Sequence, residues 1–221
     1  MKFFLKLGFV GLLFSQGFWG NEWPMPKIEY KPKTYVCYKT SAPIKMDGKL
    51  DDEAWKTATW TDLFVDIEGR LKPKPFYDTK LKMLWDDQFF YFGVDMEEPH
   101  VWAKLRQRDT VIFKDNDFEI FLDPDGDTHN YYELEVNAFE TEWDLLLLKP
   151  YHNANKVAVD SWDIPGLITK VFVDGTLNNP TDRDKGWSVE IAITWKALIN
   201  NYRSNNPPTE GEQWKVNFSS V

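Results

Sequence analysis

The middle of the chain, residues 115–148, alternates between apolar and polar positions every second residue. Two alternating runs, over 117–122 and 131–138, are followed by a mostly apolar third run that ends at Leu148, and short stretches rich in turn-forming residues separate them. Because successive side chains of a β-strand point to opposite faces of a sheet, each run presents one apolar face to a core. The pattern predicts three consecutive antiparallel strands whose core positions are Phe118, Ile120, Leu122, Tyr132, Leu134, Val136 and Ala138.

The opposite face of the same predicted strands carries acids, an amide and aromatic rings. Its positions are Asp117, Glu119, Phe121, Tyr131, Glu133, Glu135 and Asn137. An antiparallel sheet commonly packs one face on a core and leaves the other in water, so we expect this face to be exposed. A functional site is expected on it.

The same kind of alternation predicts further strands on both sides of the central stretch. Asp47-Gly48 is a turn dipeptide that precedes a short helix, and Asp86-Asp87 joins a hairpin. The expected strands cover 79–84, 89–96, 168–173, 187–193 and 214–218, and the expected helices include Ala54 and Trp55 in one and 195–199 in the other. About eight strands with one or two short helices predict an all-β fold, an antiparallel, jelly-roll-like β-sandwich.

The first twenty residues have the composition of a secretory signal peptide. Lys2 and Lys6 precede an apolar run over 7–14, and small and polar residues follow it. The run is shorter than the ~20 helical residues that span a bilayer. We therefore expect cleavage after Gly17 or Gly20, and a secreted protein, periplasmic or extracellular, without a membrane span.

The chain after this peptide divides into a lead-in and one domain. Residues 21–40 are rich in proline and show no sustained period, which indicates an extended segment. Residues 41–221 carry strand signals at an even spacing, so one β domain is favoured over two. The last predicted strand ends close to Val221, and we expect the domain to continue beyond that residue.

Charge and composition narrow the classes of partner. The formal net charge is -9 and no block of Lys or Arg occurs, whereas binding to nucleic acid needs a basic surface. Aromatic residues make up 16% of the chain, more than its core needs, so some rings are expected at the surface. The single cysteine, Cys37, excludes an internal disulfide, so packing must hold the domain together.

Five segments, in this order, resemble the family 9 carbohydrate-binding modules, and more closely the family 9-like secreted proteins of bacteria. They are IKMDGKLDDEAW at 44–55, KLKMLWDDQFFYFGVDMEEP at 80–99, RDTVIFKDNDFEIFLDPDGDTHNYYELEVNA at 108–138, GWSVEIAITW at 186–195 and WKVNFSSV at 214–221. The resemblance implies a β-sandwich that binds sugars, of a kind often appended to enzymes that degrade plant polysaccharide.

The resemblance also implies where a sugar would bind. In binding members of the family, two tryptophans hold the sugar and polar side chains on the sheet contact its hydroxyls. By position, the first tryptophan falls on Phe113, a glutamate on Glu119 and an asparagine on Asn137. An arginine falls on Glu135, so one expected donor is missing, and the second tryptophan would lie beyond Val221.

The residue types on this face suit a sugar site. A flat apolar ring covers the C–H face of a sugar, and carboxylates and amides bond to neighbouring hydroxyls. The predicted ligand-binding set is Phe113, Glu119, Glu135, Asn137, Arg108 and Trp162. Two alternatives stay open: a plain solvated face for the acids, and ion pairs with acids for Arg108.

The loop Asp123-Pro-Asp-Gly-Asp127 is a candidate metal site. Asp123, Asp125 and Asp127 place carboxylates at alternate positions, and Ca²⁺ prefers such hard oxygen ligands. The loop lacks the length and the closing Glu of an EF-hand. A turn between two strands, with Asp serving the turn geometry, is an equally good interpretation. The histidines have no mutual ligand spacing, which argues against zinc.

The leading hypothesis is non-catalytic binding of a plant-type polysaccharide or oligosaccharide, in support of extracellular carbohydrate catabolism and in association with polysaccharide-degrading enzymes. One alternative is a glycoside hydrolase with Glu119 and Glu135 as paired carboxylates. Another is a haem-binding sandwich with Met83, Met96 or His100 as iron ligand, although no C-x-x-C-H motif occurs. A third is an interaction domain with a degenerate site.

Overall fold

The computed structural model describes residues 31–153, 156–199 and 207–221. The chain divides into two units, Met1–Thr34 and Tyr35–Val221, and the second unit holds every strand named below. The predicted signal peptide and the lead-in up to residue 30 lie outside the described residues, so both stay predictions. Within the described ranges, no helix has the length and apolar character needed to cross a membrane.

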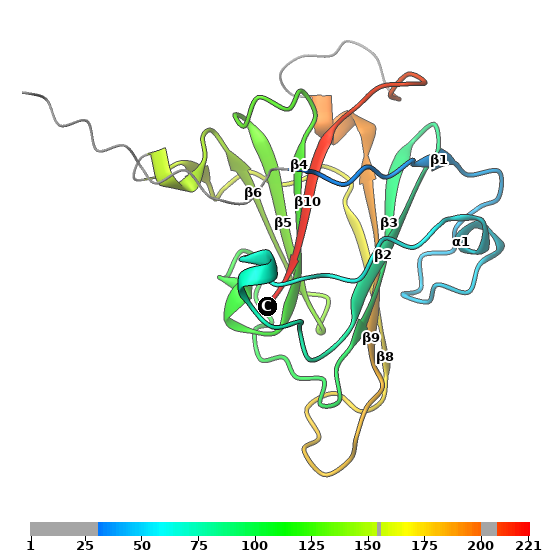
Figure 1. Ribbon diagram of the computed structural model, residues 1–221, viewed down its shortest axis with the longest axis vertical. Helices are drawn as coiled ribbons and strands as arrows, with labels where there is room; N and C mark the ends of the chain where they lie inside the picture. Colours follow the sequence, from blue (N-terminus) through cyan, green and yellow to red (C-terminus); the bar gives the residue numbers. More distant parts are fainter. Residues whose placement is uncertain (1–30, 154–155, 200–206) are drawn as a thin grey trace, which may run out of the picture. The chain divides into compact units, whose positions relative to one another are not determined.

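The second unit contains two five-stranded sheets (Figure 1). The first has the order β1-β2-β3-β9-β8 and consists of β1 (Tyr38–Lys39), β2 (Thr79–Trp85), β3 (Phe89–Glu97), β9 (Gly186–Thr194) and β8 (Ile168–Asp174). The second has the order β10-β4-β5-β6-β7 and consists of β10 (Lys215–Ser220), β4 (Asp117–Asp123), β5 (Tyr131–Asn137), β6 (Glu142–Leu147) and β7 (Ala158–Val159). Among the described strands, only the pair β1 and β2 is parallel. The predicted all-β antiparallel sandwich is confirmed.

The main hydrophobic core is built from the facing sides of the two sheets. Phe92 and Val189 of the first sheet and Phe118 of the second are fully buried in it. All the core positions predicted for the central three strands belong to this cluster. Full burial of one such side chain stabilises the fold by about 1.5–3 kcal/mol, so the alternation along the sequence decides which face of each strand points inward.

The outer face of the first sheet is covered by the segment that leads into α1 (Glu53–Thr57). Trp55 of α1 is fully buried against the outer sides of β2, β3 and β9. Gly93 on β3 makes room for it, because a Cβ there would lie 2.8 Å from the Leu50 side chain and 3.1 Å from the Trp55 ring. The cover is therefore apolar and closely fitted.

The outer face of the second sheet is covered differently, by the short 3-10 helices η2 (Ile112–Lys114) and η3 (Tyr151–Asn153). The other 3-10 helices are η1 (Gly69–Leu71) and η4 (Trp195–Ile199). The exposure predicted for this face is wrong, since Glu119 is 8% exposed and Glu135 only 1%. Alternation places these acids on the outer face, but it does not show which distant segments fold over them.

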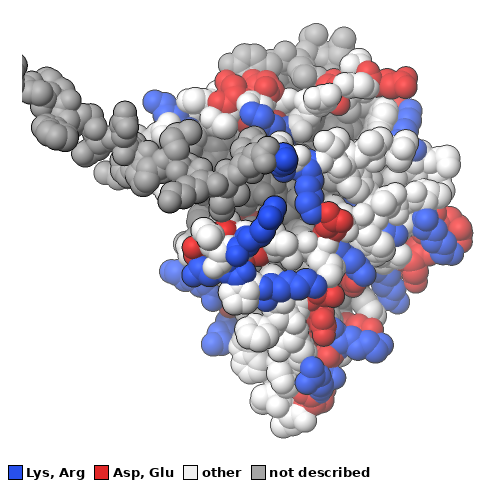
Figure 2. All heavy atoms as spheres, viewed as in Figure 1, with Lys and Arg blue, Asp and Glu red and all other residues white. Residues whose placement is uncertain are grey.

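Charged side chains of both signs are interspersed over the face of the molecule in Figure 2. Several charged side chains of the described residues form exposed ion pairs, such as Lys39 with Asp87 and Lys80 with Asp95. Exposed pairs of this kind contribute little to stability, about 0–1 kcal/mol each. Because acidic and basic side chains are mixed on the face in Figure 2, the formal charge of -9 is not concentrated there in one acidic patch.

Candidate functional site

A cluster of carboxylates lies on the outer face of β4 and β5. Glu119 is directly opposite Glu135 in the strand register, and Asp117 is opposite Asn137. One carboxylate oxygen from each of Asp117, Glu119 and Glu135 lies within 4.8 Å of the other two. Like charges directly opposite one another destabilise a sheet, so the cluster needs protons, hydrogen-bond donors or a cation.

Burial raises the pKa of each of these acids. For Glu135, burial and then the charge of Glu119 raise the pKa to about 8, although the Phe113 N–H donates to its Oε2 at 2.9 Å. For Glu119, burial raises the pKa and the Ser219 hydroxyl lowers it in part. Glu133, also on the outer face of β5, accepts a hydrogen bond from Tyr151, and burial raises its pKa to about 7.

Asp117 is the least compensated acid of the cluster. It is fully buried, and neither of its carboxylate oxygens has a hydrogen-bond partner in the described part of the chain. The Val221 N–H is near enough to lower its pKa but lies outside hydrogen-bonding geometry. Burial and the charges of Glu119 and Glu135 raise the pKa of Asp117 to about 9. Proteins seldom leave a buried carboxylate in this condition without a ligand or a proton.

Two aromatic rings lie beside the carboxylates. Phe113, in η2, is 47% exposed, and its N–H bond to Glu135 fixes its backbone over the sheet. Trp143 on β6 is directly opposite Glu135, and the centroid of its ring lies 6.2 Å from that of Phe113. Its Nε1 is buried and has no partner among the described residues. An exposed ring, carboxyl groups and an unpaired donor therefore meet on one face.

The sequence pattern did not indicate Trp143 as a member of this group. The run from Trp143 to Leu148 has too few polar residues to show which positions face outward. The missing information is the pairing of β5 with β6, in which Val136 is opposite Glu142. That register places Trp143 on the outer face beside Glu135, and it depends on the geometry of the connecting turn.

The family described as carbohydrate family 9 binding domain-like matches residues 46–213, which is 168 of the 221 residues. The chain belongs to this family. The resemblance drawn from the sequence segments is thereby confirmed.

Proteins of known structure share the fold of this family 9 domain. A family 9 module from Caldicellulosiruptor kristjanssonii, in complex with cellotriose, has a TM-score of 0.54 and 19% identity, covering 83% of this chain and 75% of that chain. Its complex with glucose has a TM-score of 0.53 and 18% identity, covering 83% and 76%. A candidate carbohydrate-binding protein from Bacteroides uniformis has a TM-score of 0.60 and 15% identity, covering 83% and 81%.

A curated relative is a much longer enzyme. Exoglucanase XynX of Acetivibrio thermocellus is 24% identical over an alignment of 119 residues that covers 52% of this chain. The chain spans 10% of the length of XynX.

Asn137 of this family 9 domain uses all its polar groups within the protein. Its amide nitrogen donates to the Leu105 carbonyl at 2.9 Å and to Asp115 at 3.0 Å. Its oxygen accepts from the backbone N–H groups of Phe139 and Thr141. Since a side-chain amide has two hydrogens, neither is left for a ligand, and Asn137 ties the turn after β5 to the neighbouring loop.

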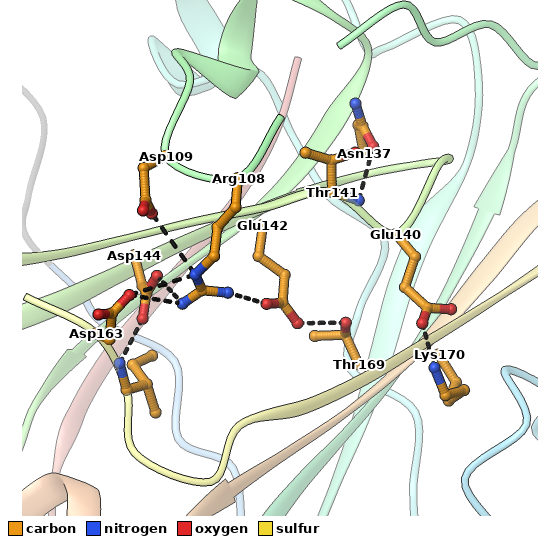
Figure 3. Close-up of polar contacts among 11 residues, drawn as sticks. Arg108, Asp109, Asn137, Glu140, Thr141, Glu142, Asp144, Asp163, Thr169 and Lys170 are labelled. Carbon is orange, nitrogen blue, oxygen red and sulfur yellow. Dashed lines mark hydrogen bonds and ion pairs between the residues drawn. The ribbon is translucent and has the colours of Figure 1, made fainter. Parts of the chain in front are cut away.

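Arg108 lies on the other side of the sheet from Glu119 and Glu135. It pairs with Glu142, with the fully buried Asp144 at 2.5 Å and with Asp163 at 3.2 Å (Figure 3). The register places Glu142 and Asp144 on the core-facing side of β6. The ion-pair alternative for Arg108 thus describes its contacts, and it links the loop before η2 to β6.

Trp162 also lies on the core-facing side of the second sheet. The centroid of its ring is 5.1 Å from that of Tyr132, which is 3% exposed in the main core. Trp162 is therefore not placed with Phe113 on the outer face. Its position in a polar segment of the sequence did not indicate this contact.

The structure brings together the three acids of the loop after β4, with one oxygen each of Asp123, Asp125 and Asp127 within 4.8 Å of the others. Asp123 accepts from the N–H groups of Gly126 and Thr128, both at 2.9 Å. Asp127 accepts from the His129 N–H at 2.7 Å. These bonds are those of turn geometry. Calcium at this loop stays a prediction.

Proposed function

We propose that this domain binds carbohydrate on the outer face of its second sheet without catalysing a reaction. Its membership of the carbohydrate family 9 binding domain-like family supports the ligand class. The observation that carries the location is the half-exposed ring of Phe113, which lies against Trp143 and is bonded through its N–H to Glu135. An exposed ring that can cover a sugar thus lies beside carboxyl groups that can bond to its hydroxyls.

The expected binding chemistry follows from these groups. The ring of Phe113 covers C–H groups of a pyranose, and apolar area removed from water contributes about 25 cal/mol per Å². Glu119 remains 8% exposed, so a sugar hydroxyl can reach it. Its raised pKa favours the protonated form, which donates a hydrogen bond to a hydroxyl and can also accept one from it. Ligand and protein separate unchanged, since no covalent step is involved.

A glycoside hydrolase fits this geometry less well. One carboxyl group must protonate the leaving oxygen, and the other must reach the anomeric carbon or the water that attacks it, with both open to substrate. Glu135 is 1% exposed beneath η2, and its Oε2 is occupied by the Phe113 N–H. Release of reducing sugar from polysaccharide by the purified protein would restore this alternative.

A haem-binding sandwich also fits less well. Met83 and Met96 are each 4% exposed and lie within the main hydrophobic core, so a haem ligated by either would have to enter that packed core. His100 is exposed at the surface. A Soret band in the purified protein would contradict this conclusion.

We further propose that the domain is secreted and acts beside enzymes that degrade polysaccharide. Secretion through the predicted N-terminal signal peptide would bring it to extracellular polysaccharide, where it supports carbohydrate catabolism. The match to a tenth of an exoglucanase supports association with an enzyme that degrades plant polysaccharide. N-terminal sequencing of protein recovered from the medium or periplasm tests the first point, and a chain that begins at Met1 would contradict it.

Isothermal titration calorimetry with cello-, xylo- and manno-oligosaccharides tests the binding. Wild type is expected to bind one of these classes. Phe113→Ala loses the ring that covers the sugar and is expected to bind at least about tenfold more weakly, which corresponds to about 1.4 kcal/mol. Phe76→Ala is the matched control, because it removes a phenylalanine ring that is 98% exposed and lies outside the proposed site. Unchanged affinity in Phe113→Ala would show that the site is misplaced.

A further inference from the structure

The candidate site contains one acid whose burial is not compensated. Asp117 is fully buried, and both of its carboxylate oxygens are without a hydrogen-bond partner in the described ranges. One of its oxygens lies within 4.8 Å of an oxygen of Glu119 and one of Glu135, so the carboxylate points into the cluster. Buried carboxylates in proteins are paired, hydrogen-bonded or bound to a metal.

The other two acidic clusters of the described residues are satisfied from within the chain. Asp109, Asp144 and Asp163 surround the guanidinium of Arg108, which supplies positive charge at their centre (Figure 3). In the Asp123–Asp127 loop, backbone N–H groups supply the donors. The ion pairs of the described residues include none of the carboxylates of Asp117, Glu119 and Glu135. The Asp117 cluster thus has neither the cation of the Arg108 cluster nor, at Asp117, the N–H donors of the loop.

We propose that Asp117, Glu119 and Glu135 bind a divalent cation of the calcium class on the outer face of the second sheet. Ca²⁺ accepts carboxylate oxygens at about 2.3–2.6 Å, which allows two of its ligands to lie up to about 5 Å apart. The oxygen separations in the cluster fall within that limit. Mg²⁺ requires near-octahedral geometry and usually keeps several waters beside one or two carboxylates, so a set of three carboxylates suits Ca²⁺ better.

The strand register supports the same ligand set. Glu119 and Glu135 are directly opposite each other, and a cation between them turns a repulsive cross-strand pair into an attractive one. Asp117 lies two residues before Glu119 and on the same face of β4. All three ligands therefore come from paired strands rather than from a loop. The remaining ligand positions of a six- to eight-coordinate ion can be filled by water.

Calcium binding without sugar tests this inference. Wild-type protein, stripped with EDTA and dialysed into chelator-free buffer, is titrated with CaCl₂ by calorimetry, and its Tm is measured with and without CaCl₂. Asp117→Asn and Glu119→Gln keep the shape of the side chain and remove one charge each. Asp127→Asn is the matched control, because it makes the same change in the neighbouring loop. Circular dichroism verifies the fold of each variant.

Wild type is expected to bind Ca²⁺ and to gain Tm, and both Asp117→Asn and Glu119→Gln are expected to bind one equivalent less than wild type. Asp127→Asn is expected to keep the equivalent that Asp117→Asn loses. The inference is overturned if wild type binds no Ca²⁺, or if Asp117→Asn binds as many equivalents as wild type. The proposed calcium site lies on the same face as the proposed sugar site. Protein that binds CaCl₂ and no oligosaccharide would contradict the proposed function alone.

Discussion

Each sheet buries an acid on its outer face, and the two acids are treated in opposite ways. Glu190 on β9 and Asp117 on β4 are both fully buried. The Glu190 carboxylate accepts bonds from the Trp55 indole at 2.7 Å and from the N–H groups of Asp47 and Gly48, each at 2.8 Å. The Asp117 carboxylate accepts none among the described residues.

This difference separates an acid used for folding from an acid kept for a ligand. The donors of Glu190 come from the segment around α1, which thereby closes the outer face of the first sheet. Gly48 belongs to that closure, because its φ is +84° and a Cβ there would lie 2.5 Å from the backbone nitrogen of Phe172. On the second sheet, Glu133 and Glu135 accept hydrogen bonds from Tyr151 and from the Phe113 N–H, but Asp117 has no donor among the described residues. We therefore place ligand binding on the second sheet and a structural contact on the first.

The largest expected effect comes from removing the partnered acid. Glu190→Ala leaves three buried donors without an acceptor, and each costs about 1–3 kcal/mol, so the free energy of unfolding should fall by about 3 kcal/mol or more. Urea denaturation measures this loss. Glu190→Gln keeps one acceptor oxygen and should lose less. A stability loss under about 1 kcal/mol in Glu190→Ala would contradict the structural role of this acid.

A smaller loss of stability is expected when Arg108 is replaced. Arg108→Met keeps an apolar stem but leaves the buried Asp144 without its positive partner. Losing one partner of a buried pair costs about 3–5 kcal/mol, and partial exposure of Arg108 reduces this to about 2 kcal/mol. Oligosaccharide affinity of the folded protein should stay unchanged. A selective loss of affinity would instead return Arg108 to the ligand-binding set.

The acids of the second sheet should make stability fall as the pH rises. In the folded protein the pKa values of Glu133, Glu135 and Asp117 are raised to about 7, 8 and 9, from 4.5, 4.5 and 3.8. Between pH 4.5 and about 9 the folded state therefore holds more protons than the unfolded state, and the free energy of unfolding decreases as they are lost. Urea denaturation in EDTA at several pH values measures the slope. A slope of the opposite sign would show that burial of these acids is not the dominant cause.

The smallest effect is expected for the acid without a partner. Asp117→Asn removes no hydrogen bond of the described structure, so its free energy of unfolding in EDTA at neutral pH should equal that of wild type within about 0.5 kcal/mol, or exceed it. Asn replaces a group that is costly to ionise in a buried position. A loss comparable to that of Glu190→Ala would mean that Asp117 has an internal partner and would remove the contrast between the sheets.

The two sheets also show which parts of the site could be predicted from the sequence. Alternation assigns Glu119 and Glu135 to one face of adjacent strands, because the period of two depends only on local backbone geometry. It could not reveal that η2 contacts Glu135 and that Tyr151 contacts Glu133, since this depends on contacts between segments far apart in the chain. The expectation of a solvated face failed for that reason.

The residues placed on the wrong side of the sheet failed for a related reason. Arg108 lies in an irregular charged stretch and Trp162 in a polar loop, and neither has a periodicity that assigns it to a face. Trp143 does lie in a strand, but its neighbours are nearly all apolar, so only the pairing with β5 shows that it points outward. The family resemblance predicted Phe113 and Glu119 as ligand-binding residues, whereas the uncompensated burial of Asp117 became visible only in the structure.

The central claim is that the outer face of the second sheet, and not that of the first, receives the ligand. Backbone amide NMR spectra during titration with the oligosaccharide that binds in calorimetry test it most directly. The account predicts chemical-shift changes concentrated at the amides of Phe113, Glu119, Glu135 and Trp143, with those of Gly48, Trp55 and Glu190 unchanged. Changes concentrated around Trp55 and Glu190, with Phe113 and Glu135 unaffected, would contradict it.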